Sequence, residues 1–181
     1  MTLVATPGSS TANTYATLQE AKLYCTNNLY TAEWDAATDS QRESALIMAT
    51  RLLDADKWPW KGSAASATQA LCWPRSGMTG RTGFPIQSDV LPQELKDAVS
   101  EFAKQLVASD RTGDNDPVRQ GITSVKAGSV SISFDPKSTT KEEASWIIIP
   151  DVVRMMIQIW KELTYEEQIL KNKTEMVFES L

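Results

Sequence analysis

Histidine is absent from this sequence of 181 residues, and cysteine occurs only twice. Without histidine, the commonest general base and the commonest neutral metal ligand are missing, as is every mechanism that pairs serine or cysteine with histidine. Cys25 and Cys72 provide neither a disulfide framework nor a zinc site, and they fit a reducing, cytoplasmic origin. We therefore expect a protein without enzymatic activity, bound metal or cofactor.

Positive charge is also scarce. Lysine and arginine total 18 residues against 23 aspartate and glutamate residues, which gives a formal charge of -5. Binding along a phosphate backbone needs the opposite balance, a basic surface. An acidic surface suits a protein past which DNA slides, because like charges repel at close range. The charge balance thus disfavours general affinity for nucleic acid.

Hydrophobic runs long enough to cross a membrane are missing as well. The most apolar stretch, 146–160, is interrupted by Pro150, Asp151 and Arg154, and it is too short for roughly 30 Å of hydrocarbon. The N-terminus has no basic segment followed by an apolar one, so we expect no signal peptide. We expect no membrane partner.

The sequence has an ordinary globular composition, with 41% hydrophobic and 23% charged residues, which suits one domain with a proper core. Hydrophobic periodicity predicts a mainly α fold, a helical bundle with a small β-hairpin and a C-terminal helix plus extended tail. The expected parts are a flexible N-terminal arm at 1–14, a helical body at 15–121 with a long Trp/Pro/Gly-rich loop at 57–91, a β-hairpin at 122–134, and a C-terminal helix and docking tail at 146–181.

Three segments of the body carry helix signals. Thr17 to Glu20 has the pattern of a capping box, and the helix that follows runs to about Asn28, with an apolar face that extends to Leu29. A second helix is expected over 38–56, where Glu43 follows Ser40 by three residues. The clearest helix has Pro92 in its first turn and carries an apolar stripe that should pack against the second helix: Leu95, Ala98, Val99, Phe102, Ala103 and Leu106.

The loop at 57–91 is long for a compact domain, and only 66–71 in it suggests a short helix. Its tryptophans stand beside prolines, which predicts a packed structural core of the loop formed by Trp58, Trp60, Trp73 and Pro74. The alternative is a stacking platform for single-stranded nucleic acid, in which the tryptophans hold bases and Lys61, Arg75 and Arg81 hold phosphates.

The last third of the chain begins with an alternation of apolar and polar residues that predicts the hairpin, with Ile122, Val125, Val130, Ile132 and Phe134 as its apolar positions. A final helix over 150–163 has little polar surface, so it must be covered on most sides. The charged tail after it keeps apolar anchors. From the residues alone, core and interface remain equally good interpretations of this helix.

An ordered set of motifs resembles a known family. It comprises A-L-x-x-A-T-R-L-L-D at 45–54, W-K-G at 60–62, Q-A-L-x-W-P-R at 69–75 and Leu91 to Ala98, after Tyr15 and Trp34. The sequence is similar over about 15–134 to phage and prophage head-tail adaptor proteins, some of which are labelled as DnaT-like single-stranded DNA-binding proteins. The resemblance implies a structural adaptor subunit of a tailed-phage head-to-tail connector, located in the neck of the virion and made in the host cytoplasm.

The same resemblance implies partners. Such adaptors form dodecameric rings beneath the portal protein and join it to a tail or nozzle protein, while DNA passes through without tight binding. By position in the chain, the portal-docking candidates are Val152, Val153, Met156, Ile159, Trp160, Leu163 and Phe178. The candidates for contact between ring neighbours are Ile122, Val125, Val130, Ile132 and Phe134.

Two other functions stay open. One is a single-stranded DNA-binding module that uses the Trp-rich loop. The other is an enzyme or enzyme regulator, for which the patterns are poor: Gly77, Gly80 and Gly83 follow no strand and open no helix, and Ser138 to Lys141 lacks the companion motifs of S-x-x-K enzymes.

Overall fold

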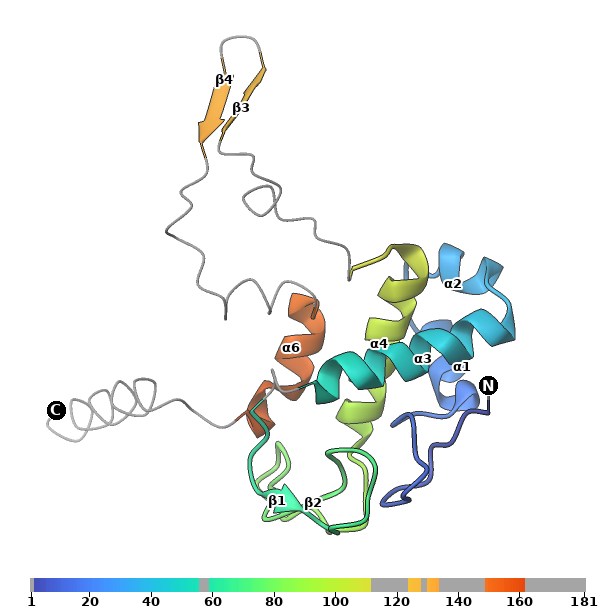
Figure 1. The fold of residues 1–181 in the computed structure, drawn as a ribbon, viewed down its shortest axis with the longest axis vertical. Coiled ribbons are helices and arrows are strands. Elements are labelled where there is room, and N and C mark those ends of the chain that lie inside the picture. Colours follow the sequence, from blue (N-terminus) through green and yellow to red (C-terminus); the bar gives the residue numbers. More distant parts are fainter. Residues whose placement is uncertain (1, 56–58, 112–123, 128–129, 134–148, 162–181) are drawn as a thin grey trace, which may run out of the picture.

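The computed structural model describes residues 2–55, 59–111, 124–127, 130–133 and 149–161. The fold is mainly helical, as predicted, with two small antiparallel sheets (Figure 1). In chain order the elements are α1 (Leu18–Thr26), α2 (Ala32–Ala36), α3 (Asp39–Asp54), β1 (Ser63–Ala64), β2 (Arg75–Ser76), α4 (Gln93–Ala108), β3 (Ser124–Ala127), β4 (Val130–Ser133), α6 (Asp151–Ile157) and the short 3-10 helix η1 (Gln158–Trp160).

Side-chain caps fix the starts of α1 and α3. At α1 the predicted capping box is confirmed, because the Thr17 N–H donates to Glu20 Oε2 at 2.7 Å and the Glu20 N–H donates to Thr17 Oγ1 at 3.2 Å. At α3 the predicted start at residue 38 is confirmed. Thr38 is the cap and its N–H donates to the Gln41 side chain at 2.8 Å, whereas Ser40, which stands three residues before Glu43, lies inside the helix.

Helix α1 is shorter than its apolar pattern predicts. It ends at Thr26, and Leu29 lies in the following loop with 76% of its surface exposed, so Leu29 does not continue the buried face. Helix α2 was not predicted. It spans five residues around the buried Trp34, and the Arg42 guanidinium donates to the Trp34 carbonyl from α3. A tertiary contact therefore supports a helix too short to show periodicity.

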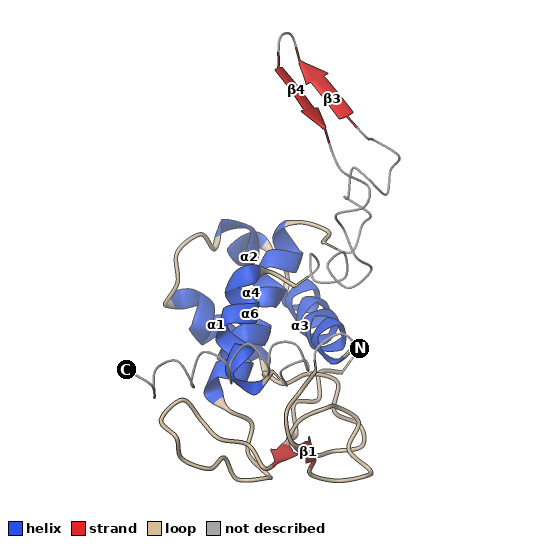
Figure 2. Cartoon of the chain, turned by 90° about the vertical axis from the view of Figure 1, so that its left-hand side faces the viewer, coloured by secondary structure: helices blue, strands red, loops and turns tan. Residues whose placement is uncertain are grey.

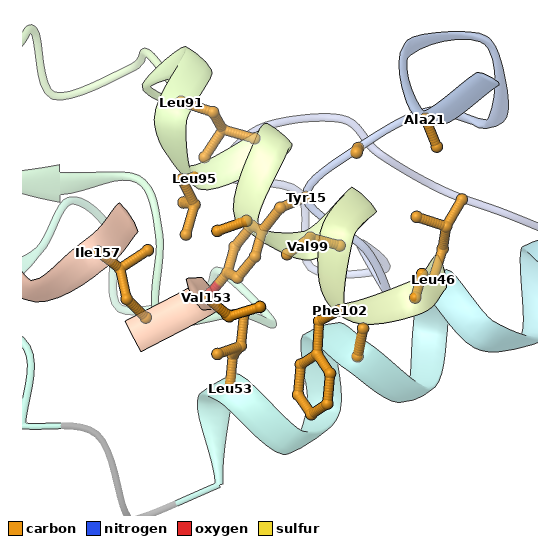
Figure 3. Packing of buried hydrophobic residues seen from close by; sticks show 14 of the residues in the cluster. Tyr15, Ala21, Leu46, Leu53, Leu91, Leu95, Val99, Phe102, Val153 and Ile157 are labelled. Atoms are coloured by element: carbon orange, nitrogen blue, oxygen red, sulfur yellow. The ribbon is translucent and has the colours of Figure 1, made fainter. Parts of the chain in front are cut away.

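Helix α4 lies at the centre of the fold and packs against α1, α2, α3 and α6. Its predicted stripe is buried from Leu95 to Ala103 and half-buried at Leu106, and α4 packs against α3, which confirms that part of the sequence interpretation. Figure 3 shows α4 residues such as Leu95, Val99 and Phe102 directed into the same core as Leu53 of α3 and Val153 of α6. The C-terminal helix is thus part of the core.

The first residues of the chain pack onto the helical body. The Val4 N–H donates to Asn13 Oδ1 at 2.8 Å, the Ala70 N–H donates to the Ser9 carbonyl at 3.1 Å, and Thr14 is 1% exposed. This arrangement differs from the flexible arm expected at 1–14. The small polar residues there form turns and hydrogen bonds that a composition argument does not register.

The two sheets are short antiparallel pairs. Strands β1 and β2 pair Ser63 with Ser76, and β3 and β4 pair Val125 with Ile132. The second pair is the predicted hairpin, with its strands over 124–127 and 130–133. Ile122 and Phe134 lie outside the described residues.

Candidate functional site around the tryptophan cluster

The loop that joins α3 to α4 is described from residue 59 onward and lies at one end of the helices (Figure 1, Figure 2). The short helix expected at 66–71 is absent from it, and turns and bends occupy this segment. In this segment the Gln69 side chain accepts from the Ser66 N–H at 2.9 Å and donates to the Leu71 and Pro74 carbonyls, so it supplies hydrogen-bond partners to the backbone of an irregular turn.

Three indole rings form the centre of this region, and we call Trp60, Trp73 and Trp160 the tryptophan cluster. The Trp73 ring meets Trp60 at a centroid distance of 5.7 Å and Trp160 at 5.2 Å, both edge to face. Their exposed fractions are 7% for Trp60 and 1% for each of the others. Trp58 lies outside the described residues.

Arg75 holds the W-K-G segment in place. Its guanidinium donates to the carbonyls of Lys61 at 2.6 Å, Gly62 at 2.8 Å and Cys72 at 3.1 Å. Gly62 has a φ of +66°, and a Cβ on it would lie 2.2 Å from the Ser76 carbonyl oxygen. A planar fork of donors and a residue without a side chain are both needed here, which explains why W-K-G and W-P-R occur together.

A buried hydrogen-bond network joins the other motifs to this loop. The Tyr15 hydroxyl donates to Asp54 Oδ1 at 2.5 Å, the Cys72 N–H donates to Asp54 Oδ2 at 2.8 Å, and the Trp73 N–H donates to the Tyr15 oxygen at 3.1 Å. Asp54 closes the A-T-R-L-L-D motif. The network therefore connects the start of α1, the end of α3 and the loop.

Burial dominates the electrostatics of this network. It raises the pKa of Asp54 above the usual value, although the hydrogen bonds from Tyr15 and from the Cys72 N–H oppose the shift. Burial, with the nearby Asp54 carboxylate, also holds the pKa of Tyr15 well above its usual value. Burial thus raises the pKa of both groups, and each already has hydrogen-bond partners within the fold.

The C-terminal helix docks onto this loop. The Lys61 N–H donates to the Trp160 carbonyl at 2.8 Å, Trp160 Nε1 donates to the Thr79 carbonyl at 3.2 Å, and the Arg81 guanidinium donates to the Met156 carbonyl at 3.0 Å. The sequence separation of these contacts is about 75 to 100 residues. Loop and helix thus form one unit.

This docking changes the predicted portal-docking set. Val153 and Trp160 are buried in the core at 0% and 1% exposure, so a partner cannot reach them, which corrects the prediction for these two residues. Val152 is 43% exposed, and Met156 and Ile159 are half-buried. Leu163 and Phe178 lie outside the described residues.

The buried geometry of the tryptophan cluster does not suit base stacking or metal binding. Base stacking needs exposed aromatic faces, and neither Trp60 nor Trp73 offers one. Within the described ranges, no group of three or more His, Cys, Asp or Glu residues could hold a metal ion. The cluster and its hydrogen bonds therefore serve to join the loop to α6.

Sequence reasoning missed the residues that the surface does present. Leu23, Leu29 and Tyr30 are 64%, 76% and 90% exposed in and after α1, and Phe84 of the loop and Met155 of α6 are 74% and 69% exposed. Their apolar character was visible in the sequence. Their exposure was not, because it depends on where each helix ends and on which face the core covers.

Comparison with known proteins assigns a family. A family model described as "Putative DnaT-like ssDNA binding protein" matches residues 1–173, so the chain belongs to that family. Neither the curated proteins nor the solved structures contain a match. Among the described helices, none has the length and apolar character to traverse a bilayer.

Proposed function

We propose that this member of the DnaT-like family is a non-catalytic structural adaptor, a subunit of a tailed-phage head-to-tail connector that binds copies of itself, a portal protein and a tail protein. The motif resemblance and the charge of -5 support this proposal. The family description does not name this function; it names single-stranded DNA binding, treated below as the second candidate.

The observation that carries the proposal is the position of the motif residues. Tyr15, Asp54, Trp60, Trp73 and Arg75 are engaged with one another and with the backbone around the tryptophan cluster. Residues of this kind build a rigid body. A rigid body whose exposed side chains include several large apolar residues is suited to contacts with other proteins.

Binding to a purified portal ring tests the adaptor function. Full-length chain should bind in ring stoichiometry, measured by the mass of the complex. A chain truncated after Lys161 keeps the described helices but lacks Leu163 and Phe178, and it should lose portal binding if the tail docks there. The double variant Leu163→Ser/Phe178→Ser tests the same contact without a truncation.

The outcomes separate cleanly. Loss of binding in both altered chains, with unchanged circular dichroism, supports docking through the tail. Binding of both altered chains keeps the adaptor function and removes the tail as its docking element. Absence of binding by the full-length chain contradicts the adaptor proposal itself.

Single-stranded DNA binding is the second candidate, and the family description favours it. The form that we considered from sequence used the Trp-rich loop. Because Trp60 and Trp73 are buried, stacking in this fold would require exposed rings such as Tyr30 and Phe84. Lysine and arginine residues near those rings would then hold the phosphates.

Fluorescence anisotropy with a single-stranded oligonucleotide tests this candidate at low and high salt. If it is correct, the chain binds at low salt, and Phe84→Ala or Tyr30→Ala weakens binding by about fivefold or more, since stacking contributes about 1 to 3 kcal/mol per base. The adaptor proposal predicts no binding in the same titration.

A further inference from the structure

The charges of the chain are distributed unevenly over the fold. The helical segments 15–55 and 92–111 contain six lysine and arginine residues against ten aspartate and glutamate residues. The loop at 59–91 and the segment 149–161 together contain five against two. Hydrogen bonds join the loop to α6, and Figure 1 shows the two side by side. This acidic chain therefore has one basic region.

Two of the basic residues lie at the C-terminal end of α6. Lys61 Nζ donates to the Ile159 carbonyl at 3.1 Å. The Arg81 guanidinium donates to the Met155 and Met156 carbonyls at 3.3 and 3.0 Å. Carbonyl oxygens carry no formal charge, and among the described residues neither cation forms an ion pair. Both residues are exposed, so they present positive charge to solvent beside this helix.

Large apolar side chains are exposed in the same region. Val152 and Met155 are 43% and 69% exposed and stand three residues apart on α6, so they share a face. Phe84 is 74% exposed, and the Gly80 N–H donates to its carbonyl at 2.9 Å, which places it in the turn that Arg81 anchors to α6. A basic surface with exposed apolar groups suits an acidic, apolar partner. We call the following residues the α6–loop face: Lys61, Arg81, Phe84, Val152 and Met155.

The sequence that follows this face has complementary properties. Residues 162–181 lie outside the described residues. They contain five glutamates against two lysines, together with large apolar residues such as Tyr165, Ile169 and Phe178. Their net charge is opposite in sign to that of the α6–loop face, and both carry apolar side chains. The segment therefore has the chemistry that the face requires of a partner.

The segment also begins at the edge of the face. The Lys61 N–H donates to the Trp160 carbonyl at 2.8 Å, and the backbone of Lys161 pairs with that of Trp60. Met155 precedes Lys161 by six residues, which is about 10 Å along a helix. Three or four extended residues span that distance at roughly 3.3 Å each. The segment is thus long enough to return along α6.

We propose that residues 162–181 bind the α6–loop face of their own chain, with the glutamates beside the two cations and the apolar side chains on the three exposed apolar residues. A tethered segment binds at an effective concentration of about a millimolar, so weak surface contacts suffice to hold it. A free polyanion such as a nucleic acid lacks this advantage. The contact rests on charge, exposure and reach, whereas its consequence, competition with a portal protein for the segment, rests on the adaptor function proposed above.

Hydroxyl-radical footprinting of the full-length chain, measured by mass spectrometry, tests whether the face is covered. Phe84 and Met155 are the reporters, and Tyr30, which is 90% exposed between α1 and α2, is the internal control. A segment that occupies the face for about two-thirds of the time lowers the labelling of both reporters about threefold. High salt should raise their labelling in the parent, because it screens the charges.

Variants of the segment leave the described helices and loop unchanged. Glu166→Lys/Glu167→Lys reverses its charge, and Ile169→Ser/Phe178→Ser removes apolar anchors. Each should raise the labelling of the two reporters about threefold over the parent, as expected from loss of that occupancy. The matched control is Glu33→Lys/Glu43→Lys, which makes the same change in net charge on α2 and α3 and should label as the parent does.

Three results would overturn the proposal. The first is equal labelling of Phe84 and Met155 in the parent and in both segment variants. The second is protection that rises with protein concentration, which would assign the face to the segment of another copy. The third is protection that appears only when a single-stranded oligonucleotide is added, which would assign the face to nucleic acid.

Portal affinity measures the consequence separately. Lys61→Gln/Arg81→Gln weakens the face and leaves the segment intact, so this full-length chain should bind portal rings about threefold more tightly than the parent, because a larger fraction of it has a free segment. Unchanged affinity would overturn the competition. Absence of portal binding by every chain would defeat the adaptor function alone, since the footprinting contrast would still stand.

Discussion

The loop at 59–91 and the helix pair of α3 and α4 are stabilised in different ways. The helices satisfy their own backbone hydrogen bonds and bury one apolar face. The loop has only two-residue strands, so side chains must supply many of its backbone partners, and Arg75, Gln69 and Asp54 do so. A periodic apolar pattern is therefore sufficient to form the helices, whereas the loop depends on particular side chains that bind its backbone.

This difference explains where the recognisable motifs lie. W-K-G and Q-A-L-x-W-P-R both belong to the loop, and the Asp54 that closes A-T-R-L-L-D binds the loop backbone. Many apolar residues can fill a helical stripe with similar volume. Few residues can replace a guanidinium that reaches four carbonyls, those of Trp60, Lys61, Gly62 and Cys72. The comparison predicts that changes to these loop residues cost more than volume-conserving or exposed changes in the helices.

The largest difference is expected from the core of each region. Trp73→Ala should lower the free energy of unfolding by about 3 to 5 kcal/mol, because it leaves a cavity between Trp60 and Trp160. Leu46→Met, a volume-conserving change at a fully buried position of α3, should cost less than about 1.5 kcal/mol. Urea denaturation measures both. Equal losses of unfolding free energy in the two variants would contradict the difference between the loop and the helices.

Next in size is the glycine of the W-K-G segment. Gly62→Ala should cost about 3 kcal/mol or more, the sum of left-handed strain and a forced backbone shift at Ser76. Gly83→Ala is the control, since Gly83 also has a positive φ, +82°, but no atom lies within 4 Å of its added Cβ. It should cost only about 1 to 2 kcal/mol. Similar losses at both glycines would show that close approach contributes nothing.

Replacement of the loop arginine sharpens the comparison further. Arg75→Lys keeps the charge but cannot reach the carbonyls of Lys61, Gly62 and Cys72 together, and we expect a loss of about 2 kcal/mol in thermal or urea unfolding. Arg51→Lys on the exposed side of α3 should change stability by less than about 0.5 kcal/mol. An Arg75→Lys variant as stable as the parent would show that Arg75 does not hold these carbonyls in place.

A smaller loss of stability is expected at the start of a helix. Thr38→Ala removes the acceptor for the Gln41 N–H and should cost about 1 kcal/mol, while Thr38→Ser keeps the hydroxyl and should cost little. Helical circular dichroism during urea unfolding reports both variants. A larger loss than that of Arg75→Lys would reverse the order of the two regions.

The smallest effect is a dependence on pH at the junction of the regions. The pKa of Asp54 is raised in the folded chain, so its contribution to stability is fully present below the ordinary aspartate pKa and is lost as the pH rises through the raised value. Unfolding free energies of the parent should therefore fall over that range relative to Asp54→Asn, which does not titrate. If the unfolding free energies of the parent and of Asp54→Asn change with pH in the same way, the pKa of Asp54 is not raised in the folded chain.

Much of the helical fold was predictable from sequence because its signals are local. The Thr17 capping box and the stripe of α4 each involve residues within a few turns of one another. The start of α3 was also predicted, but both Thr38 and Ser40 have a partner three residues on, and the extended backbone at Thr38 identifies it as the cap. Helix α2 gave no signal, since Arg42 supports it from another helix.

The candidate site was predictable only in part. The tryptophans and prolines of the loop indicated a packed structure, but the sequence could not show that Trp160 completes it or that Val153 lies in the core instead of on a docking face. The exposed Tyr30 and Met155 were equally invisible. Exposure is a property of the whole arrangement of elements.

The sequence by itself determined the mainly helical class, the start of α1, the face that α4 buries and the absence of histidine chemistry, because these depend on composition and on neighbours along the chain. Only the tertiary structure decided that Tyr15 binds Asp54, that Arg75 holds the W-K-G carbonyls and that Trp160 closes the cluster. The last of these contacts joins residues about 90 positions apart, and a contact at that separation leaves no periodic trace in the sequence.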